Sequence, residues 1–179
     1  MSIADDIELI KRRGINVPKY AYYPVNSLPR RVRLARKLVI KAVGGSIIHK
    51  SDVGAVMIGV DPEDAPVMMR RMLGRLKRYG VEGFLVQELV PRGVELFVGA
   101  KRDPQFGPVV LFGMGGINVE LYADVSVRLC PVDDEDCEDM IDETKASVVM
   151  EGFRGRPKID RRLVVGLIKK VCGLMVKST

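Results

Sequence analysis

The chain has few of the side chains that bind soft metals. Its 179 residues include one histidine, three cysteines and no tryptophan. A single imidazole excludes a histidine-rich metal site, so any bound metal must be a hard cation such as magnesium, held by carboxylate or amide oxygens. The cysteines, Cys130, Cys137 and Cys172, show no CxxC spacing. We therefore expect buried free thiols rather than metal ligands or a disulfide framework.

Long hydrophobic runs are also absent. The apolar stretches fall well short of the roughly 18–20 residues that cross a bilayer. The first residues include the acids Asp5, Asp6 and Glu8, which do not fit a secretory signal. These absences predict a cytoplasmic protein that does not associate with membranes.

Basic residues outnumber acidic ones by 29 to 23, which gives a net charge of +6. A basic chain can bind nucleic acid, but this one has no basic strand interleaved with aromatics, no zinc pattern and no recognition helix. We therefore expect no nucleic acid partner, although an autonomous basic binding protein remains a third alternative. Surface ion pairing in a heat-stable protein equally explains many charged residues. The basic residues gather in two groups: Arg30, Arg31, Arg33, Arg36 and Lys37, then Arg70, Arg71, Arg75, Lys77 and Arg78.

The composition is that of a globular chain with a substantial core, since 47% of the residues are hydrophobic and 29% are charged. A chain of this length forms one domain or two small lobes. Helices and hairpins occur in a mixture that predicts the α+β class rather than strict βαβ alternation. We place an N-terminal lobe at residues 1–80 and a C-terminal lobe at residues 81–179.

Hydrophobic periodicity and turn residues set the expected elements. A hairpin is expected around Pro91–Gly93, which separates two β-rich runs. Strands are expected at 38–43, 55–60, 84–90, 94–100, 108–112 and 125–132. Helices are expected at 4–13, from Asp61-Pro62 to Gly80, from Asp133 and from Asp160. The last three begin at an aspartate, whose carboxylate caps a helix N-terminus and suits the positive end of the helix dipole.

Several separate features suggest a nucleotide site. Lys41 ends a buried strand and can aim an ammonium group at phosphate oxygens, or it can simply reach solvent. The glycines of Gly113–Gly116 allow backbone N–H groups to approach an anion, although a short glycine run is more often a turn. Glu88 and Glu95 flank the expected hairpin turn, where a carboxylate either accepts hydrogen bonds from ribose hydroxyls or is solvated.

The single histidine, His49, lies in a polar run after the apolar stretch Leu38–Ile40. Lys50 is beside it and Asp52 lies three positions on. An imidazole, with an unperturbed pKa of about 6.5, is largely a neutral nucleophile near neutral pH and can take and release a phosphoryl group. A lone histidine in a polar loop is more often an ordinary surface residue, so the functional interpretation depends on the rest of the chain.

Seven short motifs follow one another in a characteristic order. They are His49–Gly54 (HKSDVG), Val86–Glu88 (VQE), Gly93–Glu95 (GVE), Arg102–Val110 (RDPQFGPVV), Phe112–Ile117 (FGMGGI), Asn118–Glu120 (NVE) and Asp124–Arg128 (DVSVR). In this order they resemble the β subunit, or ATP-grasp portion, of ADP-forming acetyl- and acyl-CoA synthetases, which are related to succinyl-CoA synthetase. The resemblance runs from Ile10 to the end of the chain.

The resemblance implies an ATP-grasp fold, in which two α+β lobes close on a nucleotide. It also implies a reversible reaction in which acyl-CoA, phosphate and ADP give the acid, CoA and ATP, with magnesium and a CoA-binding α subunit in a hetero-oligomer. His49 would relay the phosphoryl group to the nucleotide. The nucleotide-binding residues implied by position are Lys41 for the phosphates, Glu88 for the adenine hinge, Glu95 for the ribose, and Gly115 and Gly116 for the phosphate side.

Two departures from the family pattern bear on activity. The approach to Lys41 is short, with the basic run Leu28–Arg31 where the family has a longer helical stretch. The Asn-Pro motif and the later aspartate that bind magnesium in the family are not found, so the metal ligands are unknown. The alternative interpretation is therefore a catalytically incomplete homologue that acts as a nucleotide-binding or partner-docking module.

Overall fold

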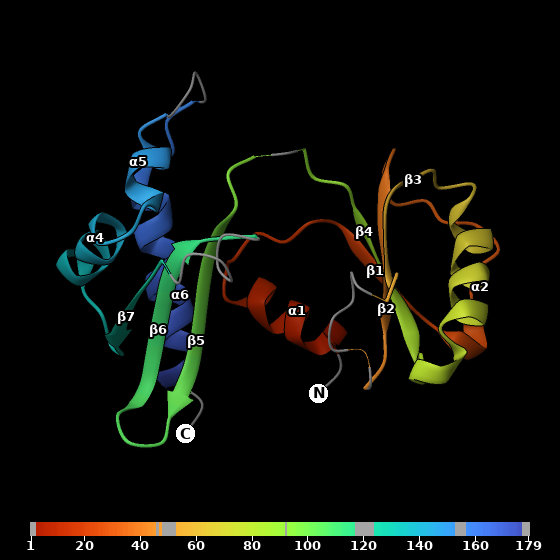
Figure 1. Cartoon of the computed structure of the whole chain (residues 1–179), viewed down its shortest axis with the longest axis horizontal. Coiled ribbons are helices and arrows are strands. Elements are labelled where there is room, and N and C mark those ends of the chain that lie inside the picture. Colours follow the sequence, from red (N-terminus) through yellow and green to blue (C-terminus); the bar gives the residue numbers. More distant parts are fainter. Residues whose placement is uncertain are drawn as a thin grey trace. The chain divides into compact units, whose positions relative to one another are not determined.

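A computed structural model of the chain describes residues 3–45, 47, 53–91, 93–116, 124–152 and 157–176. These residues divide into two compact units, the first ending at Pro91 and the second beginning at Arg92. Each unit has its own sheet and its own hydrophobic core, and Figure 1 shows the elements of each. None of the described helices is long and apolar enough to span a membrane.

The first unit is built on a four-stranded antiparallel sheet in the order β1-β4-β2-β3. Figure 1 shows its two α-helices on opposite sides of this sheet. The elements in chain order are α1 (Ile3–Arg12), β1 (Tyr20–Pro24), the 3-10 turn η1 (Val25–Ser27), β2 (Leu38–Val43), β3 (Val56–Val60), α2 (Ala65–Arg75), the 3-10 turn η2 (Lys77–Tyr79) and β4 (Gly83–Glu88).

The core of the first unit lies between the sheet and α2. Leu38, Ile40 and Ala42 of β2 are fully buried there with Met69 and Met72 of α2. Since side chains alternate between the two faces of a strand, the intervening residues of β2 point to the other face. The methionine-rich stripe of α2 is therefore core.

The second unit is built on a three-stranded antiparallel sheet in the order β5-β6-β7, with helices packed on one face. Val110 and Phe112 of β6 are fully buried under these helices, together with Ile168 of α6. The elements in chain order are β5 (Leu96–Asp103), β6 (Gly107–Met114), β7 (Val125–Leu129), α4 (Asp134–Asp142), α5 (Ala146–Met150) and α6 (Arg161–Val176).

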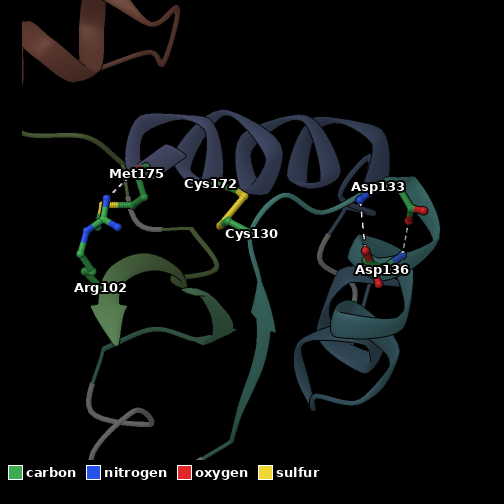
Figure 2. The surroundings of a disulfide bond; sticks show 6 residues. All are labelled: Arg102, Cys130, Asp133, Asp136, Cys172 and Met175. Carbon is green, nitrogen blue, oxygen red and sulfur yellow. Dashed lines mark hydrogen bonds between the residues drawn. A yellow bond between two sulfur atoms is a disulfide. The ribbon is translucent and has the colours of Figure 1, made fainter. Parts of the chain in front are cut away.

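The start of α4 follows the prediction that Asp133 begins an acidic helix. The backbone N–H of Asp136 donates to Oδ1 of Asp133 at 2.9 Å, and the N–H of Asp133 donates to Oδ2 of Asp136 at 3.2 Å. Figure 2 shows this reciprocal pair. It satisfies two backbone donors that a helix start otherwise leaves unpaired.

The expected hairpin around Pro91–Gly93 is wrong, and the first unit extends beyond residue 80. β4 is hydrogen-bonded to β1 along one edge and to β2 along the other, so neither edge is left for β5. β5 instead pairs along its whole length with β6. The segment between β4 and β5 therefore connects two sheets and does not form the turn of a hairpin.

The expectation of three free thiols is also wrong. Cys130 and Cys172 form a disulfide, with their Cα atoms 5.7 Å apart across a sequence separation of 42 (Figure 2). Cys130 directly follows β7, and the disulfide joins this strand end to α6, a proximity that sequence spacing does not reveal. Cys137 is the buried free thiol that we expected, and burial raises its pKa to about 11.

Candidate functional site

Lys41 lies on the face of the first sheet that α2 does not cover. Its direct neighbours across the ladder are Leu85 of β4 and Val56 of β3. Leu85 is only 2% exposed, and Lys41 is half-buried. A lysine in such a place packs its aliphatic stem against apolar neighbours and carries its ammonium group outward. The strand therefore places the stem of Lys41 between two apolar neighbours.

The register of the strands places further side chains around Lys41. Tyr22 lies opposite Leu85, while Tyr20 lies opposite Gln87. We call Tyr20, Tyr22, Lys41, Leu85 and Gln87 the Lys41 face. Sequence reasoning missed its tyrosines and its glutamine. The alternation within each strand could have indicated a shared face, but the strand order that joins them is not visible in the sequence.

Two contacts fix the tyrosines of the Lys41 face. The hydroxyl of Tyr20 donates a 3.0 Å hydrogen bond to Oε2 of Glu8 in α1. Burial, together with the neighbouring Glu8 carboxylate, raises the pKa of Tyr20, so its hydroxyl keeps its proton. The hydroxyl of Tyr22 lies over Gly83, where the Cβ of any other residue would clash with it.

Glu88 ends β4, but its side chain does not belong to the Lys41 face. It pairs with Leu38, and so follows the alternation of the buried face. Its Oε1 accepts a 2.9 Å hydrogen bond from the backbone N–H of Lys19, and its own N–H donates to the carbonyl of Lys19, also at 2.9 Å. The carboxylate thus closes the end of the β1–β4 ladder, immediately before the segment that leads to the second unit.

Glu95 and the glycine loop lie together in the second unit. The backbone N–H of Gly115 donates a 2.7 Å hydrogen bond to the carbonyl of Glu95. Gly116 has a positive φ of 68°, and a Cβ there would clash with Oε2 of Glu95. The loop therefore needs glycine at both positions for close approach to Glu95. The N–H of Gly115 is engaged by Glu95, so this group is not the anion donor that a glycine run suggests.

The face of the second sheet that bears Glu95 is largely apolar. By strand alternation and register, it carries Phe97 of β5, Leu111 of β6 and Val127 of β7. The ring of Phe97 lies against Gly99, and Val127 is 47% exposed. We call Glu95, Phe97, Leu111 and Val127 the Glu95 face. A flat apolar surface beside a carboxylate suits an aromatic base attached to a sugar. Sequence reasoning missed Phe97.

The predicted site residues thus fall into separate sets. Lys41 and Glu88 lie on adjacent strands of the first unit with their side chains on opposite faces, whereas Glu95, Gly115 and Gly116 are in contact in the second unit. His49 lies outside the described residues. In the described parts of the chain, no three His, Cys, Asp or Glu side chains gather as a metal site. The magnesium ligands are therefore not assigned to any described residue.

Comparison with known proteins gives matches over nearly the whole chain. A family profile described as ATP-grasp domain matches residues 5–178. The acetate–CoA ligase (ADP-forming) I of Archaeoglobus fulgidus is 36% identical over 183 residues, which cover 96% of this chain and 26% of that protein. The acetate–CoA ligase (ADP-forming) I subunit beta of Pyrococcus furiosus is 36% identical over 171 residues, which cover 92% of this chain and 74% of that subunit. The chain therefore spans a minor part of the first relative and most of the second.

Solved structures match as well. The dinucleotide-forming acetyl-coenzyme A synthetase 1 of Ca. Korarchaeum cryptofilum, in complex with coenzyme A, Ca-AMPCP and HgCl+, matches with a TM-score of 0.87 and 34% identity. That match covers 99% of this chain and 81% of the solved chain. Another structure of that protein, with coenzyme A and Mg-AMPPCP, matches with a TM-score of 0.80 and 34% identity over 99% of this chain and 79% of the solved one. Its phosphohistidine segment points towards the nucleotide binding site.

Proposed function

This chain belongs to the ATP-grasp family and has the ATP-grasp fold, and from that premise we propose that it is the nucleotide-binding, β-type part of an ADP-forming acyl-CoA synthetase. The reaction converts acyl-CoA, ADP and phosphate reversibly to the acid, CoA and ATP. The observation that carries the proposal is the likeness, over nearly the whole chain, to synthetase structures with a bound ADP analogue or a bound ATP analogue. The acyl group is not assigned.

Each unit contributes residues to nucleotide binding in this proposal. Lys41 supplies a positive charge to the phosphates, which offsets the charge that develops during phosphoryl transfer. Glu95 accepts hydrogen bonds from the ribose hydroxyls, and Gly115 and Gly116 let the phosphate side approach the backbone closely. Glu88 marks the adenine hinge. Because its Oε1 already accepts the N–H of Lys19, it acts there mainly by holding the end of β4 in place.

His49 is the proposed phosphoryl relay. In the direction of ATP formation, the bond between phosphorus and the imidazole nitrogen breaks, and the phosphoryl group passes to a terminal phosphate oxygen of ADP. The nitrogen keeps the electron pair of that bond, and because the other ring nitrogen carries a proton taken up from solvent, the imidazole leaves as a neutral group that can accept the next phosphoryl group. The phosphohistidine segment of the Ca. Korarchaeum cryptofilum structure supports this role. Magnesium, carried in with the nucleotide, supplies further charge neutralisation.

The proposed partner is a CoA-binding α subunit, which would make the functional form a hetero-oligomer. The support is the name of the Pyrococcus furiosus relative, a subunit beta, most of which this chain spans. We also propose a cytoplasmic location, because acyl-CoA and ADP are available there.

Calorimetric titration with ADP and magnesium tests the nucleotide site. We expect Lys41→Met to weaken binding about tenfold or more, since it removes a charge-assisted contact to phosphate. Lys77→Met, which removes an exposed lysine of η2 in the same unit, should bind like the wild type. Equal affinities for the wild type and Lys41→Met would contradict the assignment of Lys41.

The alternative is a catalytically incomplete homologue that binds nucleotide or docks a partner without turnover. An assay of ATP formation from acyl-CoA, ADP and phosphate, with a family α subunit present, separates the two functions. Nucleotide binding without ATP formation would establish the alternative.

A further inference from the structure

The segment 28–37, between η1 and β2, contains neither helix nor strand and concentrates positive charge. Lys37 forms an ion pair with Asp61 at 2.9 Å. The other four cations of the segment are exposed, and none of them forms an ion pair with any residue that the structure describes. These four are Arg30, Arg31, Arg33 and Arg36. Surface ion pairing, one explanation that the sequence left open for its basic residues, therefore does not account for this group.

The backbone that carries the four arginines is anchored to the core. Val32, between two of them, is only 4% exposed and belongs to the core of the first unit. Leu34 and Ala35 pack against the same core. Apolar residues thus hold the segment down while the guanidinium groups point away from the core. A fixed backbone reduces the conformational entropy that a ligand must overcome when it orders these side chains.

The arginines surround a hollow of about 830 Å³. Its apolar part is formed by Val32, Leu34, Ala35 and Pro62, and its charged part by Arg30, Arg31, Arg33, Arg36, Asp61 and Glu63. The volume lies within the range of roughly 300–1,000 Å³ that is typical of small-molecule sites. Four positive and two negative side chains leave a lining charge of +2, and one of the two acids, Asp61, is already neutralised by Lys37.

We propose that this hollow binds a small molecule that carries two or more phosphate groups. The planar guanidinium group matches phosphate with two parallel hydrogen bonds, which a lysine does not provide. Four neighbouring cations repel one another in the free protein, and a multiply charged anion would relieve that repulsion. The apolar wall gives the rest of the molecule a surface to contact.

A compact ligand fits better than a nucleic acid strand. Asp61 and Glu63 lie on the same hollow as the arginines, and they would repel a phosphate backbone that continued past it. None of the lining residues belongs to the Lys41 face or the Glu95 face, so this site is additional to the proposed nucleotide site and does not depend on it.

Calorimetric titration of the full chain with inorganic tripolyphosphate, at low ionic strength, tests the proposal. We expect the double variant Arg31→Gln/Arg33→Gln to bind roughly tenfold more weakly or worse. Arg70→Gln/Arg71→Gln, which removes two exposed arginines of α2 outside the hollow, should bind like the wild type. Arg31→Lys/Arg33→Lys keeps the charge but loses the paired hydrogen bonds of the guanidinium group. Its affinity for tripolyphosphate should lie between that of the wild type and that of Arg31→Gln/Arg33→Gln.

The same titration in the Lys41→Met background separates this site from the proposed nucleotide site, because tripolyphosphate can also occupy a nucleotide site. Binding that survives Lys41→Met and is lost in Arg31→Gln/Arg33→Gln supports the proposal, whether or not ADP binds elsewhere. The proposal is overturned if wild type does not bind the probe, if the α2 control loses as much affinity, or if only Lys41→Met loses affinity. Tighter binding of a single-stranded oligonucleotide, lost in Arg31→Gln/Arg33→Gln, would also overturn it and make the segment a nucleic acid contact.

Discussion

The backbone N–H of Gly115 donates a 2.7 Å hydrogen bond to the carbonyl of Glu95. This bond joins the glycine loop after β6 to the residue immediately before β5, and the Glu95 carboxylate lies against Gly116. A ribose-binding carboxylate and a phosphate-side loop need to be neighbours if they serve one nucleotide. The geometry inside the second unit therefore agrees with the roles that we propose for these residues.

Gly116→Ala should weaken both the fold and nucleotide binding. A residue with a Cβ at a φ of 68° costs roughly 1–2 kcal/mol of folding free energy, and the new methyl group must also displace the Glu95 carboxylate. Gly59→Ala is the matched control, because Gly59 has a φ of 79° but an added Cβ there meets no neighbour. Urea denaturation should show similar losses for both variants, and ADP titration should show a loss only for Gly116→Ala. Wild-type ADP affinity in Gly116→Ala would contradict this account.

Local elements of the fold were predictable from the sequence, whereas strand pairing was not. The strand Leu38–Val43 follows from a nearly continuous apolar run that ends at a glycine pair, and the α4 cap follows from an aspartate placed before a helix. The hairpin prediction around Pro91–Gly93 failed because two strands adjacent in sequence can pair with other partners. The sequence does not show that β1 and β2 occupy both edges of β4.

The family was predictable because its motifs are ordered along the chain, and the resemblance to ADP-forming acetyl-CoA synthetases is confirmed by the comparisons. The site was predictable only in part. Glu95 lies in the motif Gly93–Glu95, and Lys41 stands out as the charged residue of an otherwise apolar strand. Tyr20, Gln87 and Phe97 join their faces only through sheet register, so a residue-by-residue search had no signal for them.

Reduction of the Cys130–Cys172 disulfide should destabilise the second unit. Closing a loop over a sequence separation of 42 restricts the unfolded chain, and the chain-entropy estimate for a loop of this size is roughly 4 kcal/mol. Urea denaturation of the wild type with and without dithiothreitol measures the effect. In the control variant Cys130→Ala/Cys172→Ala, dithiothreitol should leave the urea denaturation midpoint unchanged. An unchanged wild-type midpoint after complete reduction would show that the disulfide does not contribute to stability.

Glu143 should make the stability of the second unit depend on pH in the acid range. Hydrogen bonds from Arg128 and Ser126 hold the pKa of Glu143 below its ordinary value of 4.5. A lowered folded-state pKa means that the stabilisation is present above the ordinary value and is lost as the pH falls through the folded one. Denaturation midpoints from neutral to acidic pH should therefore fall more steeply in the wild type than in Glu143→Gln. Parallel curves would contradict this role for the ion pair.

Phosphorylation of His49 tests the central claim most directly. The chain is incubated with ATP labelled on the γ-phosphate, magnesium and a family α subunit, and acid-labile phosphate is then located by mass spectrometry. The account predicts label on His49 in the wild type, no label in His49→Ala, and much reduced label in Lys41→Met. No label on the wild type, or equal labelling of His49→Ala, would contradict it.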